Sequence, residues 1–274
     1  MVEALVAFLL IGLIIAGILA HPVLIRCRRD RLKRRPFPPQ WAALLDHHLP
    51  IYARLSSNER HRLQGHIQIL LAEKQFIGCA GVQITDEIRV TIAAIACLLL
   101  LNERGKYFPK LRSILVYPGA YFATETTPLG QFLFQKRKVA RLGESWSRDQ
   151  LVLSWKQIQD DTQQWHDGRN VVLHEFAHQL DQENGSAEGV PVLTHAADYS
   201  RWAAVMTDAY HRFSDDAAWG DPTSIDRYGA KNPAEFFAVV TETFFEKPCP
   251  LMNDYPALYN LLQDYYRLNP LQWS

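Results

Sequence analysis

The segment His174-Glu175-Phe176-Ala177-His178 holds the side chains best suited to chemistry in this chain of 274 residues. Side chains four positions apart lie on one face of a helix, so His174 and His178 can direct two imidazoles at one metal ion. Glu175 projects about 100° round the helix, where it can take a proton from a metal-bound water. The pattern predicts a zinc (Zn2+) site with a general base beside it.

The residues around this segment support a metal site. Val171 to Leu173, Phe176, Ala177 and Leu180 are apolar, so we expect a helix that is buried on nearly all sides. Two imidazoles and a carboxylate in a buried helix cost free energy unless something satisfies them. The alternative interpretation is a pair of core histidines that hydrogen-bond to the backbone.

The two histidines leave a tetrahedral zinc site one protein ligand short, with water in the fourth position. An extended metzincin pattern needs Gly and His where this chain has Asp181 and Asn184, so that class is excluded. A later helix over residues 232–246 is predicted, because Asn232 suits an N-cap and Pro233 suits the first helical position. We expect the third ligand on that helix.

Two glutamates of the predicted helix, Glu235 and Glu242, lie two turns apart on the same face. Glu235 also stands at the capping-box position, and Glu242 could be a solvated carboxylate at the helix edge. Spacing alone leaves the third ligand open between them. His195, between the two motifs, is a weaker alternative.

The segments 174–181 and 232–238 together resemble the Mlc titration factor A (DgsA anti-repressor) family of zinc-dependent, aminopeptidase-like bacterial proteins. The stretch 227–237 also resembles the end of the catalytic domain of anthrax lethal factor. The resemblance covers roughly residues 110 to 250. It implies that Glu235 is the third ligand, that Glu242 orients a ligand, and that Tyr228 lies beside the metal, although a surface-loop tyrosine remains the alternative.

The resemblance implies a zinc metallopeptidase. Zinc held by His174, His178 and Glu235 lowers the pKa of bound water toward ~7. Glu175 then acts as general base, and Tyr228 hydrogen-bonds the oxyanion. Short peptides or exposed chain ends are the implied substrates. The rival expectation is a regulatory protein that sequesters a transcriptional repressor. A third, which rests only on the apolar N-terminal segment, is a peptidase for membrane-proximal proteins.

At the other end of the chain, residues 4–20 form an unbroken apolar run. Residues 4–25 carry no charged side chain. A helix of this length spans roughly 30 Å, enough to cross a bilayer. Residues 26–35 follow with seven basic side chains and one acid. A cleaved signal peptide carries its positive charges before the apolar run. The positive-inside rule therefore predicts a single-pass anchor in the bacterial inner membrane with the body in the cytoplasm. The alternative is a cytoplasmic protein whose first residues are an interfacial or mis-started segment.

The charge balance argues against nucleic acid as a partner. The chain has 29 basic and 29 acidic residues, and without residues 1–35 it retains 22 and 27. A mildly acidic body is a poor polyanion binder, so we assign the basic run to anionic headgroups. The four cysteines form no C-x-x-C pattern and predict reduced thiols, as expected in the cytoplasm.

The element pattern predicts an α+β, zincin-like (gluzincin-type) domain over residues 41–274, after an anchor over 1–25 and a basic, Pro-rich linker over 26–40. Residues 149–155 read as a strand, which we expect to be an ordinary strand of the sheet, and the alternative is an edge strand that pairs with the substrate backbone. Trp202 and Trp219 are expected in the core. Expected helices are 58–74, 86–101, 171–181, 199–213, 232–246 and 257–266, and expected strands are 113–117, 131–135 and 151–155.

Overall fold

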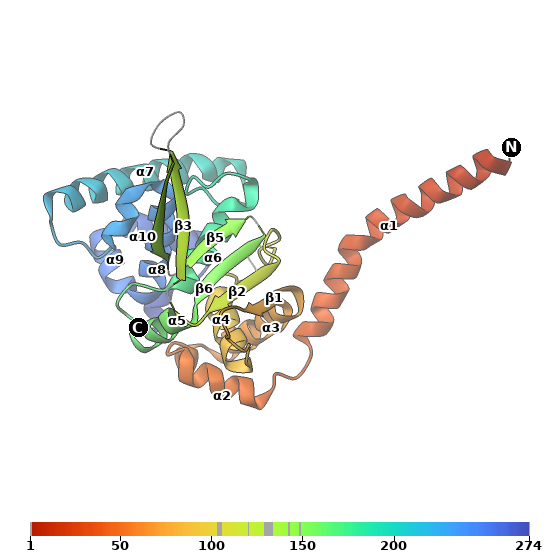
Figure 1. Cartoon of the computed structure of the whole chain (residues 1–274), viewed down its shortest axis with the longest axis horizontal. Helices are drawn as coiled ribbons and strands as arrows, with labels where there is room; N and C mark the ends of the chain where they lie inside the picture. Colours follow the sequence, from red (N-terminus) through yellow and green to blue (C-terminus); the bar gives the residue numbers. More distant parts are fainter. Residues whose placement is uncertain are drawn as a thin grey trace.

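The computed structural model describes residues 2–102, 106–119, 121–128, 134–141, 143–147 and 149–273. The chain is mostly helical and has one small sheet and a separate two-stranded ribbon (Figure 1). The shorter helices are α2 (Pro39–His48), α5 (Trp155–Gln163), α9 (Pro248–Asp254) and α10 (Pro256–Tyr266). Short 3-10 turns are η1 (Tyr52–Arg54), η2 (Gln182–Asn184) and η4 (Pro270–Trp273).

The sheet has the order β1-β2-β6-β5. Strands β1 (Gln75–Gly78), β2 (Ser113–Tyr117) and β6 (Gln150–Ser154) run parallel, whereas β5 (Gly143–Ser147) runs antiparallel to β6. In β6 the run Leu151 to Ser154 is buried on both faces, as expected of a strand inside a parallel sheet.

The expectation of an ordinary sheet strand near residues 149–155 is confirmed, and the alternative of a substrate-binding edge there was wrong. Strand β6 has β2 on one side and β5 on the other, so its backbone groups are already paired. The edge strand on this side is β5. A periodicity of side chains marks a strand but does not state its position in the sheet.

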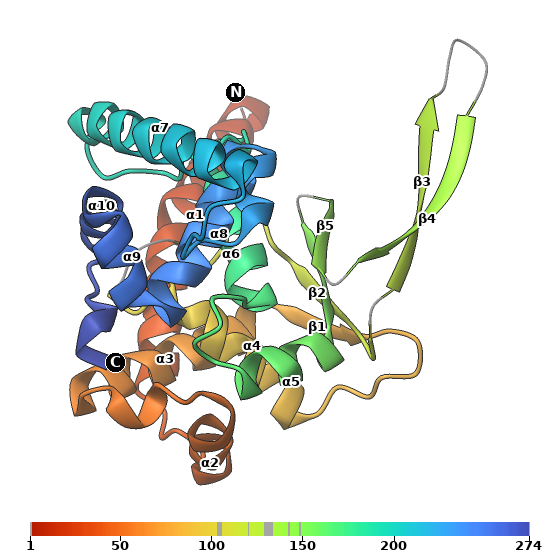
Figure 2. The ribbon, with the colours of Figure 1, turned by 90° about the vertical axis from the view of Figure 1, so that its left-hand side faces the viewer.

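Strands β3 (Tyr121–Pro128) and β4 (Phe134–Arg141) form an antiparallel ribbon that projects away from the sheet (Figure 2). The strand predicted over 131–135 lies largely outside the described residues, and β4 begins at Phe134.

The core is built around α4 (Asp86–Leu98), α6 (Val171–Asp181) and α8 (Pro233–Glu246). Thr85 caps α4, and its hydroxyl accepts a hydrogen bond from Ile88 N. The run Leu98 to Leu101 at the end of this helix is buried in the core. Long helix α7 (Ala196–Trp219) lies across one end of the domain (Figure 2).

Helix α1 (Val2–Lys33) is continuous from the apolar run into the basic run, so residues 26–33 of the predicted linker are helical. Its last turns pack along α3 (Ser57–Glu73), where Arg29 pairs with Glu73 at 2.7 Å. A Cβ added at Gly65 would lie 3.1 Å from the Lys33 side chain, which shows how closely the two helices approach.

The rest of α1 projects from the domain (Figure 1). Within the described part of the chain, this is the one helix long and apolar enough to cross a membrane. Its most apolar stretch within Leu9–Lys33 has a mean hydropathy of 2.2 and none of it is buried. The four cysteines are free thiols, as predicted.

Candidate metal centre

The N-terminus of helix α6 is fixed by hydrogen bonds to an asparagine and to two acidic side chains. Asn170 is the N-cap, and its side chain accepts a hydrogen bond from Leu173 N at 3.1 Å. Asp161 accepts from Val171 N at 2.8 Å, and Glu246 accepts from Asn170 Nδ2 at 3.0 Å. Carboxylates are favourable at a helix N-terminus because the free N–H groups and the helix dipole are positive there.

These two acids are buried, so their charged forms are disfavoured. Burial raises the pKa of Asp161 to about 7, although the hydrogen bonds from Val171 and Gln157 oppose this. Burial also raises the pKa of Glu246 to about 9, against the hydrogen bond from Asn170. The contacts fix α8 and α5 against the start of α6.

The other end of α6 is tied to α8 through a loop. Asp181, the last residue of α6, accepts hydrogen bonds from Gly189 N at 2.9 Å and Val190 N at 2.7 Å. Gly189 has φ +76°, and an added Cβ would lie 2.4 Å from Pro233 O. Only glycine allows this approach without strain. The loop therefore sets the start of α8, where Glu235 lies.

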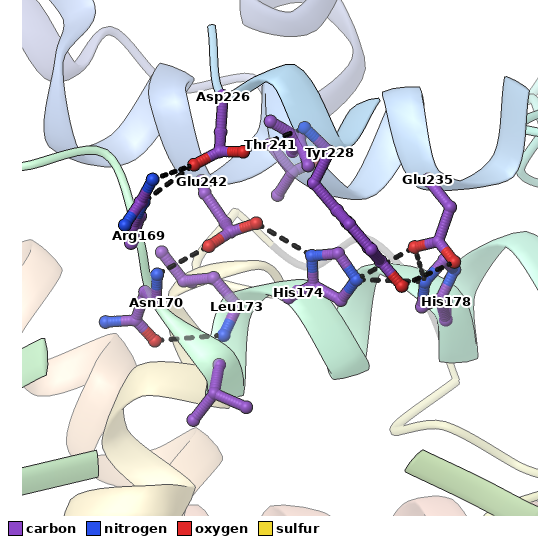
Figure 3. Close-up of polar contacts among 12 residues, drawn as sticks. Arg169, Asn170, Leu173, His174, His178, Asp226, Tyr228, Glu235, Thr241 and Glu242 are labelled. Carbon is purple, nitrogen blue, oxygen red and sulfur yellow. Dashed lines mark hydrogen bonds and ion pairs between the residues drawn. The ribbon is translucent and has the colours of Figure 1, made fainter. Parts of the chain in front are cut away.

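Helix α8 begins as its sequence predicts, with Asn232 as N-cap and Pro233 in the first position. Asn232 Oδ1 accepts a hydrogen bond from Glu235 N at 2.9 Å. The Glu235 carboxylate itself turns toward the histidines of α6 and so does more than cap the helix (Figure 3).

Three side chains converge at this point. His174 Nε2 and His178 Nε2 lie 3.2 Å apart, and Glu235 Oε2 is 3.1 Å from the first and 3.2 Å from the second. Each side chain keeps 13–15% of its surface exposed, so the cluster is reached from solvent.

The spacing fits a metal ion held by these three atoms. Zinc bonds of about 2.0–2.1 Å put neighbouring ligands of a tetrahedron about 3.3–3.4 Å apart. Hydrogen bonds account for the cluster less well, because a contact between two ring nitrogens requires one of them to carry a proton. The donor set of two imidazoles and one carboxylate therefore suits a divalent cation.

Glu242 contacts the opposite side of His174. Its Oε1 lies 2.7 Å from His174 Nδ1, and its Oε2 accepts a hydrogen bond from Asn170 N at 2.5 Å (Figure 3). A carboxylate here keeps the proton on Nδ1 and leaves the Nε2 lone pair free for a metal. The side chain is buried, so it is not the solvated edge residue that spacing also allowed.

The electrostatics favour positive charge on His174. Burial lowers the pKa of His174, but hydrogen bonds with Glu235 and Glu242 outweigh burial and raise the pKa well above its usual value. Burial alone would raise the pKa of Glu235, yet the bonds from both histidines hold it well below its usual range. Glu175 is buried next to this group, and burial raises its pKa.

Tyr228 lies beside the cluster on the 3-10 turn η3 (Arg227–Lys231). Its hydroxyl is 3.2 Å from Glu235 Oε1, and its ring centroid is 5.9 Å from that of His174. The side chain is half exposed. Its hydroxyl therefore lies close to the candidate centre, on the solvent-exposed side of Glu235.

Two residues named from the sequence lie elsewhere. His195 is exposed at the start of α7. It is not part of the one group of possible metal ligands found in the described residues, which is His174, His178 and Glu235. Trp202 is buried as predicted, whereas Trp219 is 84% exposed, so its prediction was wrong. Trp219 is the last residue of α7, beyond the packed part of the helix, and Gly220 is the C-cap.

Comparison with known proteins agrees with this geometry. The family model described as glucose-regulated metallo-peptidase M90 matches residues 24–267. Helices that present two histidines and a glutamate to one point thus occur in a metallopeptidase-type protein. The chain belongs to the glucose-regulated metallo-peptidase M90 family.

The regions matched by related proteins cover most of each relative and most of this chain. A Synechocystis protein named "Uncharacterized protein slr2042" is 45% identical over 98% of both chains. Proteins named Mlc titration factor A are 32% identical in Klebsiella pneumoniae, over 81% of this chain and 84% of the relative, and in Yersinia pestis, over 85% of each. The predicted resemblance to the Mlc titration factor A family is confirmed.

Sequence reasoning missed the residues that position the site. Glu246 follows Glu242 by one helical turn, and Asn170 immediately precedes the apolar helix, so both had a signal in the sequence. Lys231 precedes Glu235 by four residues, and its ammonium lies 3.1 Å from Glu235 Oε1. For Asp161 and Asp181 we find no local signal.

Proposed function

We propose that the chain is a zinc-dependent peptidase with a zincin fold of the gluzincin type, in which His174, His178 and Glu235 hold the metal. The observation that carries the proposal is the convergence of the three ligand atoms at 3.1–3.2 Å. Membership of a metallopeptidase family supports it.

The residues have separate roles in peptide hydrolysis. Bound zinc would supply Lewis acidity, which eases the ionisation of water and polarises a peptide carbonyl. Glu175 takes the proton of the attacking water and returns it to the leaving amine. Burial raises its pKa, which makes the carboxylate a stronger proton acceptor. Tyr228 donates a hydrogen bond to the carbonyl oxygen as negative charge develops there.

The substrate would be an extended peptide. Strand β5 ends the sheet next to β6, and no described strand pairs with its outer side. A peptide could pair with this edge through backbone hydrogen bonds. Short peptides or chain ends remain the proposed class, by similarity to an aminopeptidase-like family.

The proposed location is the bacterial inner membrane. Helix α1 would be the single-pass anchor (residues 1–25), and the peptidase domain (residues 41–274) would face the cytoplasm because the basic residues follow the apolar run. Anionic lipid headgroups would contact these basic residues.

A second candidate function is regulation by binding. The relatives named Mlc titration factor A favour it, because their name describes titration of another protein. In this case the domain would sequester a transcriptional repressor and would need no turnover.

Hydrolysis of chromogenic aminoacyl substrates by the full chain in detergent, with and without chelator, distinguishes the two functions. We expect turnover that chelator abolishes and zinc restores. Glu175→Gln should retain zinc and lose about 10²–10⁴-fold in rate. Glu87→Gln, whose parent carboxylate pairs with His48, is the control and should keep full activity.

Metal content tests the ligands separately. His174→Ala should lose stoichiometric zinc by elemental analysis, and one-to-one zinc in this variant would refute the assignment. Absence of turnover in the parent, together with binding of a partner protein, would favour the regulatory function.

A further inference from the structure

Lys231 approaches the candidate centre from the side opposite the histidines. Its Nζ lies 3.1 Å from Glu235 Oε1 and 3.2 Å from the Tyr228 hydroxyl. The two oxygens of Glu235 are thus divided, since Oε2 faces both imidazoles and Oε1 faces Tyr228 and Lys231.

This arrangement creates a competition for one proton. Tyr228 has a single O–H donor, and in the structure it is directed at Glu235 Oε1. To hydrogen-bond a substrate carbonyl, the hydroxyl must leave Oε1. Oε1 of Glu235 would then depend on its hydrogen bond from Lys231.

We propose that Lys231 is a positioning residue that holds Oε1 of Glu235 and so allows the Tyr228 hydroxyl to leave it for the substrate. The proposal rests on the peptidase function above. An ammonium has three donors, so Lys231 can hold Oε1 and the phenolic oxygen together. With Oε1 held by this charge, Oε2 is the oxygen that would be left for a metal.

The turn that carries these residues is fixed, while their side chains can move. Asp226 Oδ1 accepts a hydrogen bond from Tyr228 N at 2.8 Å, and Tyr210 donates its hydroxyl to Ala230 O at 3.1 Å. The side chain of Lys231 is 57% exposed, and Tyr228 is half exposed. A small rotation of Tyr228 therefore needs no movement of the backbone.

An ordinary surface ion pair is the alternative, because Lys231 and Glu235 are four residues apart. Such pairs contribute little. Lys156 and Asp160 form a matched pair at the same spacing, with the Lys156 side chain 66% exposed. Lys156→Met thus serves as the control for Lys231→Met.

The test is a double-mutant cycle of Lys231→Met and Tyr228→Phe in the full chain, with kcat, KM and the zinc dissociation constant measured for each variant. Lys231→Met should lower kcat about 10–100-fold and change KM and zinc affinity less than about threefold. In the Tyr228→Phe background the same change should cost less than about threefold. Lys231→Arg should recover part of the rate, and Lys156→Met should match the parent.

Other results would overturn the assignment. Losses that multiply in the double variant mean that Lys231 does not act through Tyr228. A fall in zinc affinity as large as the fall in kcat means that Lys231 only supports the metal ligand. A parent without chelator-sensitive turnover refutes the peptidase and this role together, whereas an active parent with an unaffected Lys231→Met variant refutes this role alone.

Discussion

Glu242→Gln isolates the residue that orients His174 without changing the size of the side chain. In the parent, both carboxylate oxygens accept hydrogen bonds, one from His174 Nδ1 at 2.7 Å and one from Asn170 N at 2.5 Å. Glutamine has one acceptor and one NH₂ donor. Whichever way the amide turns, its NH₂ group faces one of these N–H groups.

The cost follows from this mismatch. A buried donor without a partner costs about 1–3 kcal/mol. If His174 avoids the mismatch by moving its proton to Nε2, it loses the lone pair that a metal needs. We therefore expect the zinc dissociation constant to rise about 10–100-fold, which is about 1.4–2.8 kcal/mol.

The assay is competition for zinc with a chromophoric chelator at neutral pH, with circular dichroism as the check on folding. Glu246→Gln is the matched control, one turn further along α8. Glu246 also accepts two hydrogen bonds, from Gly168 N and Asn170 Nδ2, so glutamine there turns its NH₂ group toward one of two donors just as at Glu242. These partners do not include His174, so zinc affinity should change less than about threefold.

A folded Glu242→Gln variant with parental zinc affinity would refute the reasoning. The same holds if Glu246→Gln weakens zinc as much, because the effect would then come from the start of α6 in general and not from His174.

Three further predictions concern the fold. Gly189→Ala should lower the free energy of unfolding by at least about 2 kcal/mol in urea titration, because alanine is strained at positive φ and its Cβ would meet Pro233 O; an unchanged midpoint would contradict this. The raised pKa values of Asp161 (about 7) and Glu246 (about 9) mean that the folded state holds protons that the unfolded state releases. The free energy of unfolding of the metal-free protein should therefore fall as pH rises from about 4 to 9, and Glu246→Gln should flatten the upper part of that curve. Deletion of residues 1–24 should move the protein from the membrane to the soluble fraction after centrifugation, and recovery of the full chain in the soluble fraction would argue against an anchor.

Local signals in the sequence were sufficient where the structure depends on neighbouring residues. The four-residue spacing of His174 and His178 fixes a shared helix face, because helical geometry repeats every 3.6 residues. Asn232 and Pro233 marked the start of α8 for the same reason, and the structure begins that helix at Pro233. The apolar run of α1 could be read from hydropathy alone.

Contacts between distant segments could not be read in this way. Spacing placed Glu235 and Glu242 on one face of α8 but did not say which of them meets His174 Nε2 and which meets Nδ1. Their separation from His174 is 61 and 68 positions, and only the packing of α6 against α8 assigns each carboxylate to its nitrogen.

The amino-acid order by itself determined the two imidazoles on one helix, the acid-bearing helix that follows and the apolar N-terminal segment. Tertiary structure decided which oxygen faces which nitrogen, that Lys231 shares Glu235 with Tyr228, and that β6 lies inside the sheet. The physical reason is that periodicity specifies the faces of an element, whereas the angle and offset between elements follow from how the whole core packs.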